Sequence, residues 1–182
     1  MQKDNHIKEV LITSEQIKNR IREMALQISA DYRGKNPLLV GILKGVWVYL
    51  ADLARELTCD CEINFMSVSS YGNSTVTSGS VTILKDISVS VKGRDVIIVE
   101  DIVDTGITMS RLKELFLGRG AASVAATTIV SKPSRRLVDV WVEYVGFDIP
   151  DKFVIGYGMD FAEKYRGLTD ICVFDESTIE RK

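Results

Sequence analysis

Residues 96–110 read Val-Ile-Ile-Val-Glu-Asp-Ile-Val-Asp-Thr-Gly-Ile-Thr-Met-Ser, and this stretch decides the fold class. Its first four residues are aliphatic and mostly β-branched, which is typical of a strand buried on both faces of a parallel sheet. Glu100 and Asp101 follow and are expected to end that strand. Apolar residues then recur at helical spacing over residues 112–116. The predicted order is therefore buried strand, acidic edge, small polar turn and helix.

The turn after the acidic pair predicts a site for a sugar phosphate. Ligands of open parallel sheets bind at the carboxyl ends of the strands, where this turn lies. Backbone amides at a helix start, with the hydroxyls of Thr105 and Thr108, can cradle an anion. Glu100 and Asp101 would repel a phosphate beside them, but carboxylates bind sugar hydroxyls and Mg²⁺. Together these features indicate a ribose 5-phosphate, although solvated acids and an ordinary helix start explain each residue taken singly.

The composition indicates one globular domain over residues 1–182. Of these residues 46% are hydrophobic and 26% are charged, which is enough apolar material for a substantial core. The formal net charge of −2 gives no sign of a nucleic-acid-binding surface. The N-terminus is polar, and no run approaches the ~20 apolar residues that span a bilayer. We expect a cytoplasmic protein without nucleic-acid or membrane partners.

Cysteine and histidine usage narrows the possible chemistry. An odd count, Cys59, Cys61 and Cys172, argues against a disulfide framework, and we interpret all three as reduced structural thiols. The only histidine, His6, lies near the polar N-terminus and is expected to be solvated. Triad chemistry of the Ser-His or Cys-His type therefore needs a different base.

The first third of the chain reads as helix, strand and helix. Thr13-Ser14-Glu15-Gln16 forms a capping box for a helix that Gly34 closes. Residues 38–43 read as a buried strand that runs into Lys44-Gly45, and a helix is expected from Trp47 onward. A lysine followed by glycine at a strand end can offer a cation and a free amide to an anion. A routine strand-to-helix turn explains the same residues.

Two further strands flank a polar segment. Residues 63–68 and 81–85 have strand character. The residues between them are rich in Ser, Thr and Gly, which is typical of a lid over a site or of a hairpin tip without a role.

The C-terminal half adds strands and three candidate binding positions. Strands are expected over residues 121–130, 140–145 and 171–174. Lys132 follows the first of these and is either a site residue or a solvated loop lysine. Phe153 could pack in the core or stack on a flat heterocycle.

The stretch from residue 96 to 110 resembles the phosphoribosyl-pyrophosphate loop of type I phosphoribosyltransferases. That loop has four apolar residues, two acids, two apolar residues and then Asp-Thr-Gly-x-Thr. The form Glu-Asp-Ile-Val-Asp-Thr-Gly, with Phe-x-Ile-Pro-Asp-Lys-Phe-Val at residues 147–154, is most similar to the hypoxanthine–guanine branch. Matching segments run from about residue 38 to 174. Ile107 departs from the Lys, Leu or Asn common in that branch, at a position expected to contribute mainly its backbone.

The resemblance implies an α/β fold. A central, mostly parallel twisted sheet is flanked by helices, with a small hood formed from about residue 132 to 182 and the N-terminal segment. A flexible lid loop over about residues 70–80, beginning with Ser70 and Tyr71, is expected to close over the site. The peptide between Leu43 and Lys44 is expected to be able to adopt the cis form.

The resemblance also implies an activity in purine salvage. A 5-phosphoribosyl group passes from phosphoribosyl pyrophosphate to N9 of hypoxanthine or guanine, which forms IMP or GMP and pyrophosphate. Mg²⁺ is the implied cofactor, and homodimers or homotetramers are common in the family.

The resemblance also implies a role for each residue that matches the family's motifs. Asp104 is placed to accept the proton at purine N7 and is the expected catalytic group. The other implied roles are 5′-phosphate binding by Asp104, Thr105, Gly106, Ile107 and Thr108; ribose and metal association by Glu100 and Asp101; and pyrophosphate binding by Lys44, Gly45 and Arg166. Purine binding is implied for Lys132, Phe153, Val154 and Asp160, of which Asp160 also helps to hold a metal through water, unless Asp160 and Arg166 form only a salt bridge.

Two other functions remain open. A regulator of RNA or DNA that binds phosphoribosyl pyrophosphate usually has a basic face or an added DNA-binding domain, and neither is evident here. An enzyme of the same fold could act on xanthine, adenine or a pyrimidine, but Lys132 and Phe153 favour a 6-oxopurine.

Overall fold

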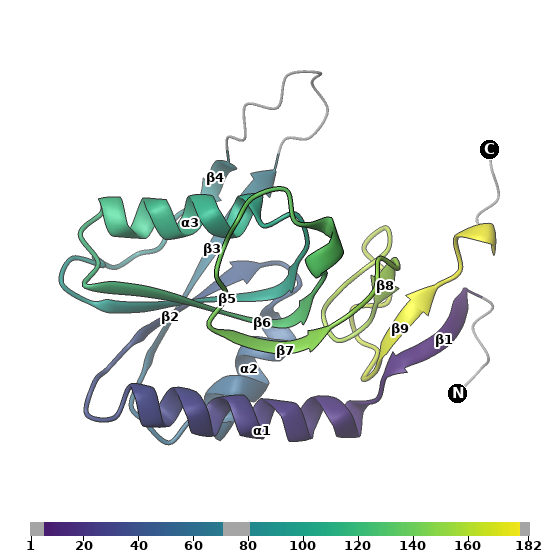
Figure 1. Ribbon diagram of the computed structural model, residues 1–182, viewed down its shortest axis with the longest axis horizontal. Helices are drawn as coiled ribbons and strands as arrows, with labels where there is room; N and C mark the ends of the chain where they lie inside the picture. The colour runs from purple at the N-terminus through teal and green to yellow at the C-terminus, as the bar shows by residue number, and fades with distance from the viewer. Residues whose placement is uncertain (1–5, 71–80, 179–182) are drawn as a thin grey trace.

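The computed structural model describes residues 6–70 and 81–178 (Figure 1). Ser70 is the last residue of a strand, whereas Tyr71 and the rest of the expected lid lie outside the described residues. The helices are α1 (Ser14–Asp31), α2 (Trp47–Glu56) and α3 (Ile107–Gly118), with short 3₁₀ turns at Pro133–Arg135 and Glu176–Thr178. The strands are β1 (Ile7–Ile12), β2 (Leu38–Leu43), β3 (Glu62–Ser70), β4 (Val81–Lys85), β5 (Asp95–Val103), β6 (Ser123–Ser131), β7 (Tyr144–Asp148), β8 (Val154–Ile155) and β9 (Ile171–Phe174).

A six-stranded sheet with the order β4-β3-β2-β5-β6-β7 forms the centre of the molecule. Its strands pair in parallel except for β4, which runs antiparallel to β3. The chain winds outward from β2 to β4 and then returns to β5, on the other side of β2. Strands β2 and β5 are therefore neighbours at the point where the winding reverses. The predicted α/β class, with a mostly parallel sheet, is confirmed.

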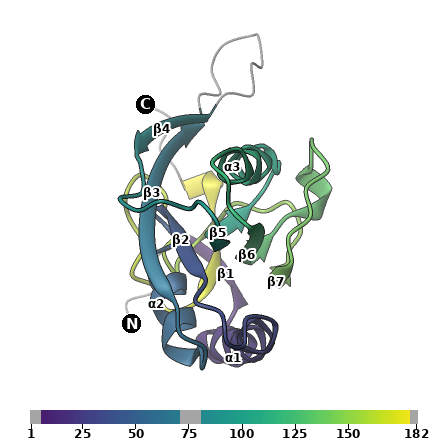
Figure 2. The same ribbon diagram turned by 90° about the vertical axis from the view of Figure 1, so that its left-hand side faces the viewer.

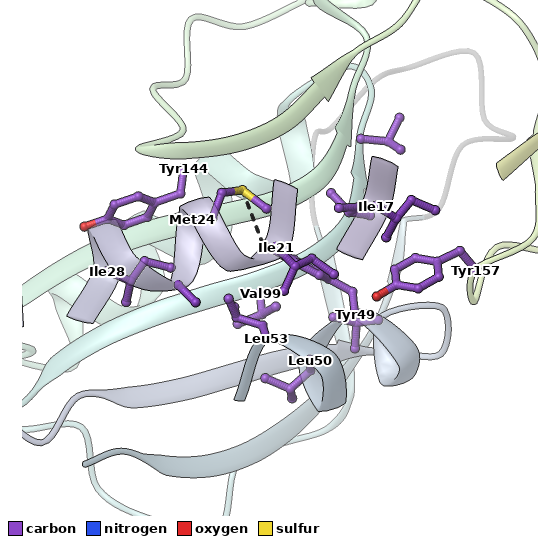
Figure 3. Close-up of a cluster of buried hydrophobic side chains, with 14 of the residues drawn as sticks. Ile17, Ile21, Met24, Ile28, Tyr49, Leu50, Leu53, Val99, Tyr144 and Tyr157 are labelled. Carbon is purple, nitrogen blue, oxygen red and sulfur yellow. Dashed lines mark hydrogen bonds between the residues drawn. The ribbon is translucent and has the colours of Figure 1, made fainter. Parts of the chain in front are cut away.

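Helices cover both faces of this sheet (Figures 1 and 2). Ile97 and Val99 pack with α1 and α2, as the cluster in Figure 3 shows for Val99, while Val96 and Ile98 pack with α3. All four side chains are 0% exposed, so this run is buried on both faces as its composition predicted. Among the described residues, no helix is long and apolar enough to cross a bilayer.

A second sheet, the antiparallel β1-β9-β8, forms the hood beside the carboxyl edge of the large sheet (Figure 1). Strand β7, which lies in the sequence range expected for the hood, pairs with β6 in the large sheet. The expectation that His6 is solvated is wrong, because its partly buried ring stacks on Phe174 with centroids 5.9 Å apart. Its neighbour strand β1 brings it there by pairing with β9.

The acidic pair does not end its strand, which corrects one prediction. Strand β5 continues through Glu100 and Asp101 to Val103. Ile102 and Val103 remain in register with Val130 and Ser131 of β6. Continued pairing with β6, which ends in register with it at Ser131, therefore carries β5 past its polar residues, and the turn begins at Asp104.

The strand expected over residues 140–145 begins only at Tyr144. The ammonium of Lys113 on α3 donates to the carbonyl of Trp141 at 2.7 Å and to the carboxylate of Glu143 at 2.8 Å. That carboxylate also accepts a bond from the amide of Ala126 at 2.7 Å. The Glu143 side chain thus takes a backbone amide of β6 with which a strand over residues 140–143 would have to pair.

We expect Phe116→Ala to lower the free energy of unfolding by about 3–5 kcal/mol, because its 0% exposed ring fills the core under α3. Urea denaturation followed by circular dichroism measures this. The adjacent Leu117→Ala is the control, since a side chain 55% exposed should change stability by no more than about 0.5 kcal/mol. Equal losses in the two variants would contradict the assignment of Phe116 to the core.

Candidate active site

The predicted site residues gather at the carboxyl edge of the sheet, around the reversal between β2 and β5. Lys44 and Gly45 follow β2, the turn from Asp104 to Thr108 follows β5, and Lys132 follows β6. Two cavities of about 250 and 240 Å³ lie there, and Ile102 and Asp104 line both. The arrangement offers two adjoining compartments with Asp104 between them. This is the position at which open α/β sheets bind ligands.

The first cavity is lined by the turn after β5. Gly106 has φ +82° and precedes α3, and a Cβ there would lie 2.7 Å from a methyl carbon of Val140. Only glycine fits this backbone. Thr105 and Thr108 line the cavity, and Ile107 begins α3 with its amide donating to the Thr105 hydroxyl at 3.4 Å. The phosphate cradle predicted from the sequence thus has its hydroxyls and helix start in place.

The two adjacent acids line different cavities. Glu100 lines the first and Asp101 the second. Burial, reinforced by the neighbouring charge of Asp101, raises the pKa of Glu100 well above its ordinary value. Its Oε2 atom is buried and has no hydrogen-bond partner among the described residues. Burial also raises the pKa of Asp101 to about 6. Both carboxyl groups are therefore costly to ionise until hydroxyl groups or a cation reach them.

The Lys44-Gly45 turn is held tightly between two segments of the site. Its preceding peptide, Leu43–Lys44, is cis, as expected. A Cβ at Gly45 would lie 1.6 Å from Oδ2 of Asp101, and a Cβ at Gly158 would lie 1.9 Å from the Gly45 carbonyl oxygen. The backbone of Gly45 is therefore in close contact with both β5 and the segment that follows β8.

Asp160 and Arg166 form an ion pair of 2.8 Å, and this pair faces Asp101. Arg166 lowers the pKa of Asp101 and Asp160 raises it, although burial is the largest influence. The guanidinium also donates to the carbonyl of Gly158 at 2.9 Å. The salt bridge between Asp160 and Arg166, which the sequence analysis gave as an alternative to a binding role, therefore exists, and it lies at the site.

The second cavity contains the residues predicted to bind a purine. Lys132, Phe153, Val154 and Asp160 all line it. Lys132 is only 7% exposed, and its ammonium lies 3.6 Å from Oδ1 of Asp151. Phe153 is 42% exposed and packs edge-on against Phe174 with centroids 5.9 Å apart. An aromatic ring, a buried ammonium and a strand backbone can together bind a flat, polar heterocycle.

Sequence reasoning missed three charged residues of this site. Arg135 contacts Asp104 at 2.8 Å and Asp151 at 3.2 Å. Glu163 contacts the ammonium of Lys44 at 2.9 Å. The position of Arg135, three residues after Lys132 at the strand edge, was a signal that could have identified it. Asp151 lies within the motif at residues 147–154, which gave it no role of its own, and no local pattern distinguishes Glu163.

A larger hollow of about 490 Å³ lies at the opposite edge of the sheet. Its lining comes from the end of α1 and from the loops before β2 and β3, including Arg33, Asn36 and Asp60. Ligands of such sheets bind beyond the carboxyl ends of the strands, so we assign the active site to the two smaller cavities.

Comparison with known proteins identifies the family. A model described as the phosphoribosyl transferase domain matches residues 11–162. The chain belongs to the phosphoribosyltransferase family. It is 46% identical to the hypoxanthine-guanine phosphoribosyltransferase of Bacillus subtilis over 96% of this chain and 97% of that relative. For that of Streptococcus agalactiae the identity is 47%, over 95% of this chain and 96% of the relative.

Solved phosphoribosyltransferases share the fold as well. A crystal structure of a hypoxanthine phosphoribosyltransferase from Staphylococcus aureus has a TM-score of 0.92 at 40% identity, covering 97% of this chain and 98% of that one. The resemblance drawn from residues 96–110 and 147–154, to the hypoxanthine–guanine branch of this phosphoribosyltransferase family, is therefore confirmed.

We expect Glu100→Gln to stabilise the metal-free phosphoribosyltransferase at pH 8. The folded protein raises the pKa of Glu100, so the folded state binds this proton more tightly than the unfolded chain. Stability is therefore lost as the pH rises above about 4.5, the ordinary value, and the loss persists above the folded pKa. Urea denaturation in a chelating buffer should give the variant the higher midpoint at pH 8, and a smaller advantage at pH 5.

The control is Glu114→Gln, whose side chain is 61% exposed on α3. Its midpoint should follow that of the wild type at both pH values. A wild type more stable than Glu100→Gln at pH 8 would show that the buried carboxylate is not a cost to folding.

Proposed function

We propose that this phosphoribosyltransferase acts in purine salvage and moves a 5-phosphoribosyl group from phosphoribosyl pyrophosphate to N9 of hypoxanthine or guanine. The products are IMP or GMP and pyrophosphate. The observation that carries the proposal is the pair of cavities joined at Asp104. The turn with Thr105 and Thr108 lines one of them, Lys132 and Phe153 line the other, and the acidic pair is divided between the two.

The sugar phosphate belongs in the first cavity. The amides at the start of α3 and the hydroxyls of Thr105 and Thr108 bind its 5′-phosphate. Glu100 and Asp101 accept hydrogen bonds from the ribose diol, which relieves the cost of their burial. With both ends of the sugar held, C1 faces the second cavity. Positioning of this kind replaces a chance encounter with a reaction between fixed partners.

Mg²⁺ fits the donors that this site offers. The residues described include no cluster of three or more acidic, histidine or cysteine side chains that could hold a metal by themselves. Mg²⁺ commonly takes only one or two protein carboxylates together with substrate phosphates and water. Asp101 and Asp160 are oxygen donors on one cavity rim, and Glu100 has a buried oxygen without a partner. When bound with the donor, the ion neutralises negative charge on its oxygens.

The leaving pyrophosphate belongs beside the Lys44-Gly45 turn. The ammonium of Lys44 and the guanidinium of Arg166 are within ion-pair distance of Glu163, at 2.9 and 3.2 Å. Both cations are thus already held at the site. They stabilise the charge that builds up as the bond from C1 to oxygen breaks and its electron pair leaves with pyrophosphate.

The purine belongs in the second cavity. Phe153 stacks on the ring, the backbone at Val154 reads its edge, and Lys132 donates to the 6-oxygen. As N9 forms its bond to C1, the proton at N7 passes to Asp104, which raises the nucleophilicity of N9. Arg135, 2.8 Å from Asp104, orients that carboxylate.

The same proposal extends to the localisation, oligomeric state and base specificity of the enzyme. We infer a cytoplasmic enzyme that forms a homodimer or homotetramer. Its base specificity is for a 6-oxopurine, because a buried ammonium at Lys132 suits an oxo group rather than the amino group of adenine. A regulatory role without catalysis is the second candidate, and its only support is that the phosphate cradle could hold phosphoribosyl pyrophosphate without turnover.

The experiment that tests the function uses purified protein, phosphoribosyl pyrophosphate and Mg²⁺ with hypoxanthine, guanine, xanthine, adenine or uracil in turn. We expect release of pyrophosphate with hypoxanthine or guanine, and loss of turnover when a chelator removes Mg²⁺. Donor binding without turnover on any base would favour the regulatory candidate. Turnover restricted to adenine or uracil would overturn the role of Lys132.

Two substitutions separate the chemical step from base binding. Asp104→Asn removes the proton acceptor and should lower kcat about 10²- to 10⁴-fold, with a smaller effect on the KM for hypoxanthine. Lys132→Ala should mainly raise that KM. Steady-state kinetics on both variants measures these effects, with the exposed Lys152→Ala as control for the loss of a lysine near the base pocket. The reverse pattern would show that the two roles are exchanged.

A further inference from the structure

Tyr157 has a backbone conformation that is unusual for a tyrosine. Its φ is +49°, and it lies between Gly156 and Gly158, with φ of +94° and +99°. Bulky residues rarely adopt the left-handed region, and those that do are held there by their surroundings, often at functional sites. The side chain of Tyr157 is only 5% exposed. What holds this residue in place is therefore informative.

The hydroxyl of Tyr157 donates to Oδ2 of Asp52 on α2 at 2.7 Å. Figure 3 shows the Tyr157 ring reaching toward Tyr49 and the core beneath α1. Burial and this bond raise the pKa of Tyr157, which keeps its hydroxyl protonated and able to donate. The other oxygen of Asp52 accepts from Arg55. The bond joins the segment after β8 to a helix far away in the sequence.

Both ends of this bond connect directly to the active site. On one side, α2 begins at Trp47, two residues after Gly45. On the other side, Tyr157 is followed by Gly158, which lies against the Gly45 carbonyl and accepts a bond from Arg166. Asp160 follows three residues after Tyr157. The Asp52–Tyr157 bond thus spans the two segments between which the pyrophosphate is expected to bind.

We propose that Asp52 and Tyr157 are a positioning pair for the phosphoribosyl donor. Their hydrogen bond sets the spacing between the Lys44-Gly45 turn and the segment that carries Asp160 and Arg166, and so governs binding of the diphosphate and of Mg²⁺. Neither side chain lines the two cavities, so the pair acts through these neighbours. The proposal rests on the proposed function, because it assigns the donor to that site.

The chain contains a matched control for a purely structural role. Tyr144 is 6% exposed, and its hydroxyl donates to Asp31 at 2.7 Å. Burial and this bond raise its pKa as well. Tyr144 begins β7 and Asp31 ends α1, so this bond lies away from the carboxyl edge. Removing either tyrosine hydroxyl deletes one oxygen from a similar buried environment.

The test compares Tyr157→Phe, Asp52→Ala and the double variant with Tyr144→Phe. Because a bond to a charged group is lost, we expect Tyr157→Phe to raise the KM for phosphoribosyl pyrophosphate and the Mg²⁺ concentration for half-maximal rate by about tenfold. The KM for hypoxanthine should stay within about twofold. The double variant should resemble Asp52→Ala, since the hydrogen bond that Tyr157→Phe removes is already absent there. Arg55→Ala controls for the ion pair that Asp52 also loses.

Thermal denaturation completes the comparison. Tyr144→Phe should lose as much stability as Tyr157→Phe but leave all three kinetic values unchanged. Equal kinetic behaviour of the two variants would overturn the proposal and leave Tyr157 a core residue. If Asp52→Ala does not fold, Tyr157→Phe still decides the question. If the wild type turns over no base, the proposed function fails, whereas titration calorimetry with the donor and Mg²⁺ still tests the pair.

Discussion

The carboxyl groups of two consecutive residues, Glu100 and Asp101, are largely removed from water where the sheet reverses its winding. Water would stabilise their charges far better than this environment does, and their raised pKa values reflect that cost. The fold tolerates this unfavourable burial because β5 is held in place on both sides of the two acids. Four fully buried aliphatic residues precede them, and pairing with β6 continues after them. The strand cannot move its acids into solvent without breaking the core of the domain. The site is destabilised locally and supported by the rest of the sheet, which is common where binding or chemistry takes place.

The cations around this pair are kept in place by acids of their own. In each case a basic side chain is paired with a carboxylate, which comes from a different segment in all but the Arg166–Asp160 pair, so the position of its charge is fixed within the protein. In the proposed function, the donor would exchange a carboxylate partner of Lys44 and of Arg166 for phosphate oxygens, so that neither side chain has to be ordered from a free state. The pairs are Lys44 with Glu163, Lys132 with Asp151, Arg135 with Asp104, and Arg166 with Asp160.

Close backbone contact joins these elements into one unit. Gly45 fits against Asp101 on one side and against Gly158 on the other, with no space for a side chain at either glycine. A change in any of the three segments is therefore transmitted to the other two. Tyr157 connects this unit with the core beneath α1 and α2 through its packing and its bond to Asp52.

The sequence by itself determined the fold class, the buried run of β5 and the turn from Asp104 to Thr108, because these depend on local composition and short spacing. It also placed Lys132 and Phe153 beside that turn through resemblance to a family. Only the tertiary structure decided where β5 ends, that β1 exists, and that residues 140–143 are not a strand. It alone revealed the contacts of Glu163 with Lys44 and of Tyr157 with Asp52, whose partners are 119 and 105 residues apart. Such contacts depend on packing between distant elements, which leaves no periodic or local pattern in the chain.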